Sequence, residues 1–275
     1  MNLPSFELQV PAKSIRVMVT EPGHSTPDGW TGCGIGLNIE FKAESLATYF
    51  FKGWSPVLED ALLVAGAVEY CDMSLSRPFR TWARAIHLTV PVHELERWKM
   101  PTVAATLQDA LNYLTGDSWI LDFVKRQESA FKARQQPLEL ESPARAVIPF
   151  SNGLDSCSVA DLESRTLGSA LVRVRLGTSD RDMRRKERRT EAFAKVPYSV
   201  KGEHKESSMR SRGFKFGMVS GLAAFLADAP RVIMPESGQG AIGPALAPLG
   251  QVYADYRTHP TFLRKLERFL EALLG

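Results

Sequence analysis

The chain has 275 residues, 44% of them hydrophobic, and a formal net charge of +3. This length and composition are typical of a folded protein that buries a sizeable core in one large domain or two small ones. The longest apolar stretches, residues 61–68 and 222–226, fall far short of the roughly 20 residues of a membrane span, so no membrane partner is expected.

The N-terminus and the cysteines both favour a cytoplasmic location. Residues 1–7 have neither the basic leader nor the apolar core of a secretion signal. Cys33, Cys71 and Cys157 lie far apart with no paired spacing, which argues against a disulfide framework and against a Cys-x-x-Cys metal knuckle. The five histidines are scattered as well. We therefore assign no protein metal site.

The first half predicts a mixed α+β module. Strand-like stretches rich in β-branched and aromatic residues occupy residues 15–20, 36–41, 83–92 and 119–123. Two helical patterns, residues 58–73 and 102–114, lie between them. From about residue 125 to residue 145 the sequence is polar and loses its periodicity, which indicates a connector. We place a domain boundary there, dividing the chain into residues 1–137 and 138–275.

The second half changes to alternating strands and helices. Strands are predicted at residues 144–150, 170–176, 195–200 and 231–234, and helices at residues 156–167, 210–227 and 261–274. This alternation is typical of an α/β domain with a parallel sheet covered on both faces.

Six cationic side chains crowd between Arg181 and Arg189 within this half. This basic run has two interpretations: a solvated loop, or a contact for phosphate, nucleic acid or an acidic partner.

The most informative segment follows the first strand of the second half. There the chain reads Ser151-Asn152-Gly153-Leu154-Asp155-Ser156 and then enters a helix. Ligands of parallel sheets bind beyond the carboxyl ends of the strands, where helix N-termini attract anions. Gly153 permits a tight turn, and the hydroxyls of Ser151 and Ser156 add donors. Asn-Gly alone would also suit a β-turn, whereas the whole hexapeptide favours a phosphate site.

Ser-x-Gly-x-Asp-Ser after a strand resembles the loop of the PP-loop ATP pyrophosphatases. Residues 210–214, which open a helix with two arginines, and residues 255–260 resemble segments of 7-cyano-7-deazaguanine synthase. Residues 255–260 are closer still to its antiphage-defence relatives, including the Qat type, and residues 58–122 look like the extra N-terminal module of those relatives. The resemblance covers most of the chain, although only the hexapeptide is highly specific.

The resemblance implies an ATP-dependent ligase that uses Mg²⁺. In this family a carboxylate is adenylated, pyrophosphate leaves, and an amine attacks the mixed anhydride to form an amide. The implied acid is 7-carboxy-7-deazaguanine, as in queuosine biosynthesis. The amine is ammonia in the housekeeping synthase, where a second activation yields the nitrile. In the defence relatives it is a partner protein's amino terminus. The N-terminal module would then serve as a platform for the partner or the substrate.

The resemblance also gives each segment a role. The loop would bind the phosphates of ATP, with Asp155 supporting the loop or hydrated magnesium. Arg210 and Arg212 would clamp phosphate or carboxylate, although arginines snorkelling from a helix end would look the same. Glu236, a plain loop acid in the alternative interpretation, would hold an amino group of a purine-like ring. The remaining expected substrate contacts are Ser237, Gly238 and Arg257.

Three departures from the family keep other functions open. The chain has Asn152 where the family usually has a second glycine, and it lacks the synthase's four zinc-binding cysteines, so no zinc is expected. It also stops at Gly275, where such relatives commonly continue, as either a short form or a truncated one. The alternative function is a non-catalytic module that binds nucleic acid or a protein through its basic surface. A third option is a different adenylated intermediate, as in tRNA thiolation or amide ligation.

Overall fold

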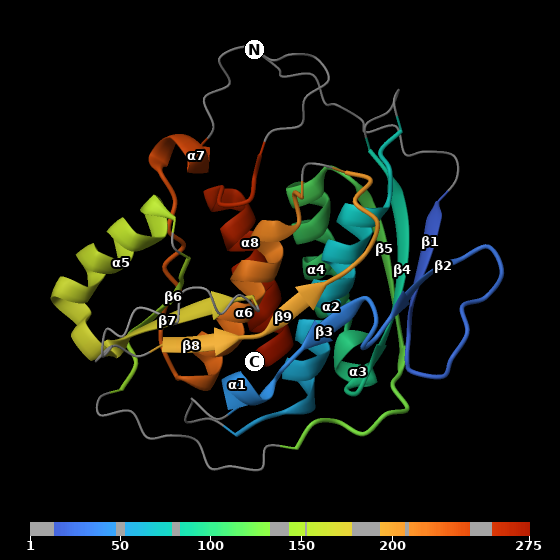
Figure 1. Cartoon of the computed structure of the whole chain (residues 1–275), viewed down its shortest axis with the longest axis horizontal. Helices are drawn as coiled ribbons and strands as arrows, with labels where there is room; N and C mark the ends of the chain where they lie inside the picture. Colours follow the sequence, from blue (N-terminus) through green and yellow to red (C-terminus); the bar gives the residue numbers. More distant parts are fainter. Residues whose placement is uncertain are drawn as a thin grey trace.

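The computed structural model describes residues 14–47, 53–78, 83–132, 143–151, 153–177, 193–206, 209–242 and 255–275. It is an α/β protein in which four long helices lie between two sheets (Figure 1). The first half of the chain forms one sheet and two of these helices, and the second half forms the other sheet and two more. The predicted α/β class is confirmed at the level of parallel sheets flanked by helices.

The sheet of the first half is parallel throughout, with the strand order β2-β1-β4-β5. Its strands are β1 (Ile15–Thr20), β2 (Thr31–Gly34), β4 (Ala85–Val92) and β5 (Ser118–Lys125). Helical segments connect β1 to β4 and β4 to β5, as parallel pairing requires. This corrects the expectation of a mixed α+β module for residues 1–137.

Helices α2 (Pro56–Ser74) and α4 (Pro101–Thr115) cover the inner face of this sheet, and both begin with proline at the first turn. Every residue of α2 after its first is buried, as expected for a helix with apolar residues all round. Gly116, at φ 70°, ends α4 in the left-handed conformation that glycine favours. The short helices of this half are α1 (Glu44–Ala47) and α3 (Leu95–Trp98).

The second half forms a parallel sheet in the order β6-β7-β8. Helix α5 (Leu154–Leu167) packs on its outer face through a small cluster that contains Ala160 and Ile148. The predicted strand at residues 231–234 is a single parallel bridge between Val147 and Val232. The strands are β6 (Ala146–Pro149), β7 (Leu171–Leu176) and β8 (Phe193–Val196), with the 3-10 turn η1 (Gly168–Ala170) before β7.

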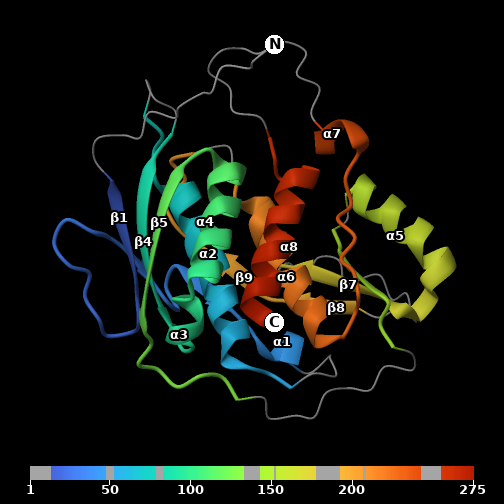
Figure 2. The same cartoon turned by 180° about the vertical axis from the view of Figure 1, so that it is seen from behind.

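Contacts of several kinds join the two halves. Strand β3 (Ile39–Phe41) pairs antiparallel with β9 (Tyr198–Val200), α6 (Arg212–Leu226) packs on α2, and α8 (Pro260–Leu274) packs on α4 (Figure 2). One apolar cluster accordingly runs from Val17 to Leu273. The predicted domain boundary near residue 138 lies outside the described residues.

The outer face of the first sheet has no helical cover among the described residues, and Ile120 and Val124 on it are 48% and 46% exposed. Within the described ranges, none of the helices combines the length and the apolar character that a bilayer span requires.

Candidate active site

The loop after β6 folds back over the start of α5. Phe150 N donates to Val174 O (2.7 Å). The pairing of β6 with β7 therefore continues for one residue after the end of β6. Gly153 then takes an extended conformation as the N-cap of α5, and its N–H donates to Ser151 Oγ (3.2 Å). Ser151 Oγ also lies 3.0 Å from Ser156 Oγ. Two hydroxyls therefore meet beside the amides of a helix N-terminus, an arrangement suited to a phosphate.

A cavity of about 290 Å³ lies directly against this loop. It is at the carboxyl end of β6, where ligands of parallel sheets bind. Residues from four separate stretches of the sequence line it, and each stretch was predicted to contribute to the site. The predicted residues in the lining are Ser151, Gly153, Asp155, Ser156, Arg212, Glu236 and Arg257.

Arg212, the first residue of α6, is exposed and lines the same cavity as the loop. Its guanidinium lies 5.4 Å from the centre of the Phe216 ring, one turn further along the helix. The next residue, Gly213, packs against the Arg257 backbone so closely that a Cβ there would be 2.3 Å from the Arg257 carbonyl oxygen. The start of α6 and the loop at residues 255–258 are therefore fixed against each other.

Arg257 forms a bidentate pair with Asp255. Its Nε lies 2.9 Å from Asp255 Oδ1 and 2.8 Å from Oδ2, and its Nη2 also donates to Oδ2. The hydrogen bonds that Arg257 donates to Asp255 raise the pKa of Arg257. Burial acts to raise the pKa of Asp255, but the bonds and the charge of Arg257 outweigh burial and lower it. Much of the Arg257 charge is thus neutralised locally, and Arg212 is the more available cation.

Glu236 connects two loops of the cavity wall. Its Oε1 accepts from Ser237 N (3.0 Å), and its Oε2 accepts weakly from Thr258 Oγ1 (3.4 Å). Both oxygens thus have local partners, and the side chain holds residues 236–237 beside residue 258.

The other predicted site residues lie elsewhere or outside the described ranges. Arg210 is only 8% exposed and does not line the cavity. Its charge helps to lower the pKa of Asp255, and it opposes the rise that burial causes in the pKa of Tyr256. Leu154 is 82% exposed, and Ser237 and Gly238, the latter in α7 (Gly238–Ile242), are exposed and outside the lining. Asn152 and the basic run at residues 181–189 fall outside the described residues.

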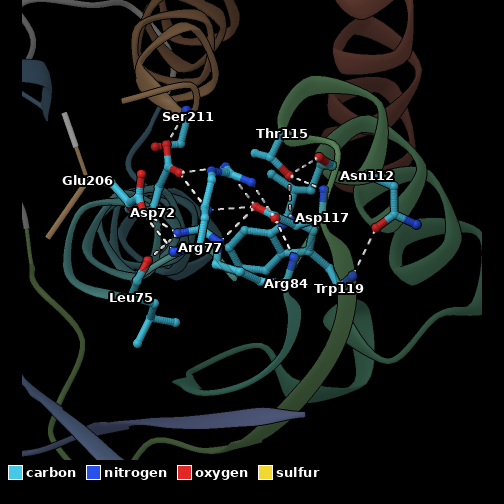
Figure 3. Close-up of polar contacts among 11 residues, drawn as sticks. Asp72, Leu75, Arg77, Arg84, Asn112, Thr115, Asp117, Trp119, Glu206 and Ser211 are labelled. Carbon is cyan, nitrogen blue, oxygen red and sulfur yellow. Dashed lines mark hydrogen bonds and ion pairs between the residues drawn. The ribbon is translucent and has the colours of Figure 1, made fainter. Parts of the chain in front are cut away.

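The sequence reasoning missed a buried ionic cluster that supports this site from the first half of the chain (Figure 3). Arg84 Nη2 lies 2.7 Å from Asp72 Oδ1 and 2.6 Å from Asp117 Oδ2, and these three side chains are completely buried. Arg77 Nη1 adds a 2.7 Å contact to Asp117 Oδ1. Burial acts to lower the pKa of Arg84, but the two carboxylates outweigh burial and raise it.

This cluster reaches the start of α6. Ser211 N donates to Asp72 Oδ2 at 2.7 Å, and Arg77 N donates to Glu206 Oε1 at 2.6 Å. A signal was present in the sequence, because helix α2 carries four acids among otherwise apolar residues, and buried acids need partners. The cluster fixes the residue directly before Arg212.

Comparison with family models, with curated proteins and with solved structures finds no match for this chain. In the part of the chain that the structure describes, no three His, Cys, Asp or Glu side chains are arranged to hold a metal ion. Function is therefore argued from the cavity and its lining.

Proposed function

We propose that this chain is an ATP-dependent ligase that adenylates a carboxylate, and that the acid is 7-carboxy-7-deazaguanine or a close analogue. The observation that carries the proposal is the cavity at the carboxyl end of β6, which Ser151, Asp155, Ser156, Arg212 and Arg257 line together. Hydroxyls and helix N-terminal amides together with an exposed arginine suit a triphosphate.

In the proposed reaction a carboxylate oxygen attacks the α-phosphorus of ATP, the bond to the β-phosphate oxygen breaks, and pyrophosphate leaves. The loop at residues 151–156 would hold the departing pyrophosphate through the Ser151 and Ser156 hydroxyls and the first amides of α5. Arg212 would face the charge that develops on the transferring group. An amine then attacks the acyl carbon, AMP departs, and an amide remains.

The lining also suits Mg²⁺. This ion typically binds one or two carboxylates together with phosphate oxygens and water, and Asp155 lies in the first turn of α5 against the cavity. When bound with ATP, Mg²⁺ would supply charge neutralisation to the leaving pyrophosphate. Asp155 would hold the hydrated ion. We further propose that the amine is ammonia or a partner protein's amino terminus, and that the enzyme acts in the cytoplasm in deazapurine chemistry or antiphage defence.

The proposal is tested by measuring pyrophosphate release from ATP and Mg²⁺ with 7-carboxy-7-deazaguanine, with and without candidate amines. Ser151→Ala and Asp155→Asn should lower the rate at least tenfold. Ser164→Ala and Asp161→Asn are matched controls, because both residues lie on α5 outside the cavity lining. Within the described part of the chain, their side chains bond to neighbours on their own helix. Loss in the two loop variants with full activity in the two controls would support the proposal.

Two other outcomes would contradict it. If the wild type releases pyrophosphate without the deazaguanine, the enzyme adenylates another acid, as in other amide ligations. Failure to bind ATP, together with binding of nucleic acid that weakens steeply with added salt, would favour the non-catalytic module.

A further inference from the structure

A second cavity, of about 370 Å³, lies on the other side of Arg212. It shares Arg212, Phe216 and Arg257 with the cavity at the loop, so the two are neighbours. Its remaining wall comes from both halves of the chain: Glu69 of α2, the end of β7, Tyr198 of β9 and Lys215 of α6. A volume of this size is within the range of small-molecule sites.

The wall of this cavity carries a buried ion pair. Lys215 Nζ lies 2.5 Å from Glu69 Oε2, and the two side chains are 12% and 6% exposed. Among the described residues, Glu69 Oε2 has this ion pair but accepts no hydrogen bond. Buried carboxylate oxygens normally accept hydrogen bonds, and one that does not calls for a functional explanation.

Aromatic rings flank the pair. Lys215 Nζ lies 5.2 Å from the centre of the Tyr198 ring, and Tyr198 is anchored through its hydroxyl to the backbone carbonyl of Leu62. Gly66 makes room for this anchor, because a Cβ there would be 2.9 Å from the Tyr198 hydroxyl. Phe216, in the shared wall, offers a ring at the border with the first cavity. The cavity thus combines a donor, a carboxylate and aromatic surface.

On the premise of the proposed function, we infer that the second cavity holds the ring of the acid substrate, and that Glu69 and Lys215 select a guanine-type edge. That edge presents one carbonyl oxygen beside two N–H donors. Lys215 donates to the carbonyl oxygen, and the two Glu69 oxygens accept from the two N–H groups. An adenine-type edge offers a single amino group beside a ring nitrogen, which leaves one carboxylate oxygen without a donor.

This placement directs the acid toward the phosphates. With its polar edge at Glu69, a ring that lies along Phe216 presents its opposite side to Arg212, in the wall shared with the first cavity. The substrate carboxylate then meets the exposed guanidinium between the two cavities. Glu69 belongs to the first half of the chain, so that half contributes directly to substrate selection.

The inference assigns the ring to Glu69 and not to Glu236, and binding measurements separate the two. We would titrate 7-carboxy-7-deazaguanine into the protein by calorimetry without ATP, for the wild type, Glu69→Gln, Glu236→Gln and Glu203→Gln. Glu203 is a matched control, since it is an exposed acid paired only with Lys205. We expect the affinity to fall at least tenfold in Glu69→Gln and to stay within twofold in Glu203→Gln. A smaller loss in Glu236→Gln than in Glu69→Gln supports the assignment.

A second variant covers the case in which Glu69→Gln leaves Lys215 unpaired and unfolds the protein. The double variant Glu69→Met/Lys215→Leu replaces the pair by apolar side chains, a change that buried ion pairs commonly tolerate. It should melt near the wild-type temperature, bind ATP as the wild type does, and bind the deazaguanine at least tenfold more weakly.

The results of these experiments distinguish a failure of the ring site from a failure of the proposed ligase activity. Deazaguanine binding that depends on Glu69, without any pyrophosphate release, refutes the ligase and supports the ring site. Pyrophosphate release that needs Ser151 but has an unchanged KM for the deazaguanine in Glu69→Gln supports the ligase and overturns the ring site. Absence of deazaguanine binding by the wild type, or a greater loss in Glu236→Gln than in Glu69→Gln, also overturns it.

Discussion

Gly213 and Arg257 touch backbone to backbone, and a methyl group on residue 213 would lie 2.3 Å from the Arg257 carbonyl oxygen. This contact sets the spacing between two arginines that reach the candidate active site from different segments, Arg212 at the start of α6 and Arg257 before α8. The obstacle is backbone and not the end of a flexible side chain, so it cannot rotate away.

Gly213→Ala should therefore displace the loop at residues 255–258 and weaken ATP binding. We expect a loss of stability of about 1–3 kcal/mol, the usual cost of overpacking, and at least tenfold weaker binding of ATP. Gly53→Ala is the matched control, because a Cβ there meets nothing within 4 Å. Chemical denaturation and nucleotide titration measure the two effects. If the two variants show the same stability and the same affinity for ATP, the contact between Gly213 and Arg257 does not position the site.

The ionic cluster around Arg84 predicts a large stability effect. Arg84→Met removes the closer of the two arginines that Asp72 shares with Asp117 and leaves Arg77 to face both buried acids, and loss of one member of a buried pair typically costs about 3–5 kcal/mol. Arg165→Met breaks an exposed pair with Asp161, which should cost less than about 1 kcal/mol. Urea unfolding monitored by tryptophan fluorescence distinguishes the two. Similar losses in both variants would contradict a structural role for the cluster.

The Asp255–Arg257 pair predicts a stability contribution that disappears in acid. The folded pKa of Asp255 lies below its ordinary value of 3.8, so the contribution is fully present above about that pH. It is lost as the pH falls through the lower folded pKa. The melting temperatures of the wild type and Asp255→Asn should therefore differ at pH 7 and converge below pH 4. A difference that stays constant down to pH 3 would show that the charge of Asp255 does not matter.

The cysteines predict selective labelling. Cys157 is exposed at the start of α5, whereas Cys33 and Cys71 are completely buried, and burial raises the pKa of both thiols. Iodoacetamide reacts with the thiolate, so the folded protein should be modified at Cys157 alone, and all three cysteines should react in urea. Peptide mass spectrometry gives the site of each label. If Cys33 or Cys71 is modified as fast as Cys157 without denaturant, these two cysteines are not buried in the folded protein.

The elements with clear local patterns were predicted closely from the sequence. Strand β1 matches its prediction in both bounds, and α4 is extended by one residue at each end. Strand β2 was missed because Thr31-Gly32-Cys33-Gly34 has two glycines and no apolar run. The strand predicted at residues 195–200 was wrong in one respect: it is two strands, β8 and β9, which separate at Pro197 and join different sheets.

In the candidate site, too, the features encoded by adjacent residues were predicted, and a contact between distant segments was not. The loop at residues 151–156 could be identified because its hydroxyls, glycine and acid are adjacent in the sequence. Its meeting with Arg212, Glu236 and Arg257 in one cavity follows from the rule that ligands collect at the carboxyl end of a parallel sheet. Glu69 and Lys215 could not be paired from the sequence, because α2 and α6 come from opposite halves and nothing local encodes their contact.

The packing of α8 on α4 has a consequence for synthesis on the ribosome. The chain emerges from its N-terminus, so the apolar side of α4 is made long before Phe262, Leu266 and Phe269 of α8 are available to bury it. The nascent chain therefore exposes that surface until α8 has emerged from the ribosome, and exposed apolar surface of this kind is prone to aggregation. The candidate active site, whose walls include Arg257 and Thr258 just before α8, is completed only after these residues have been made.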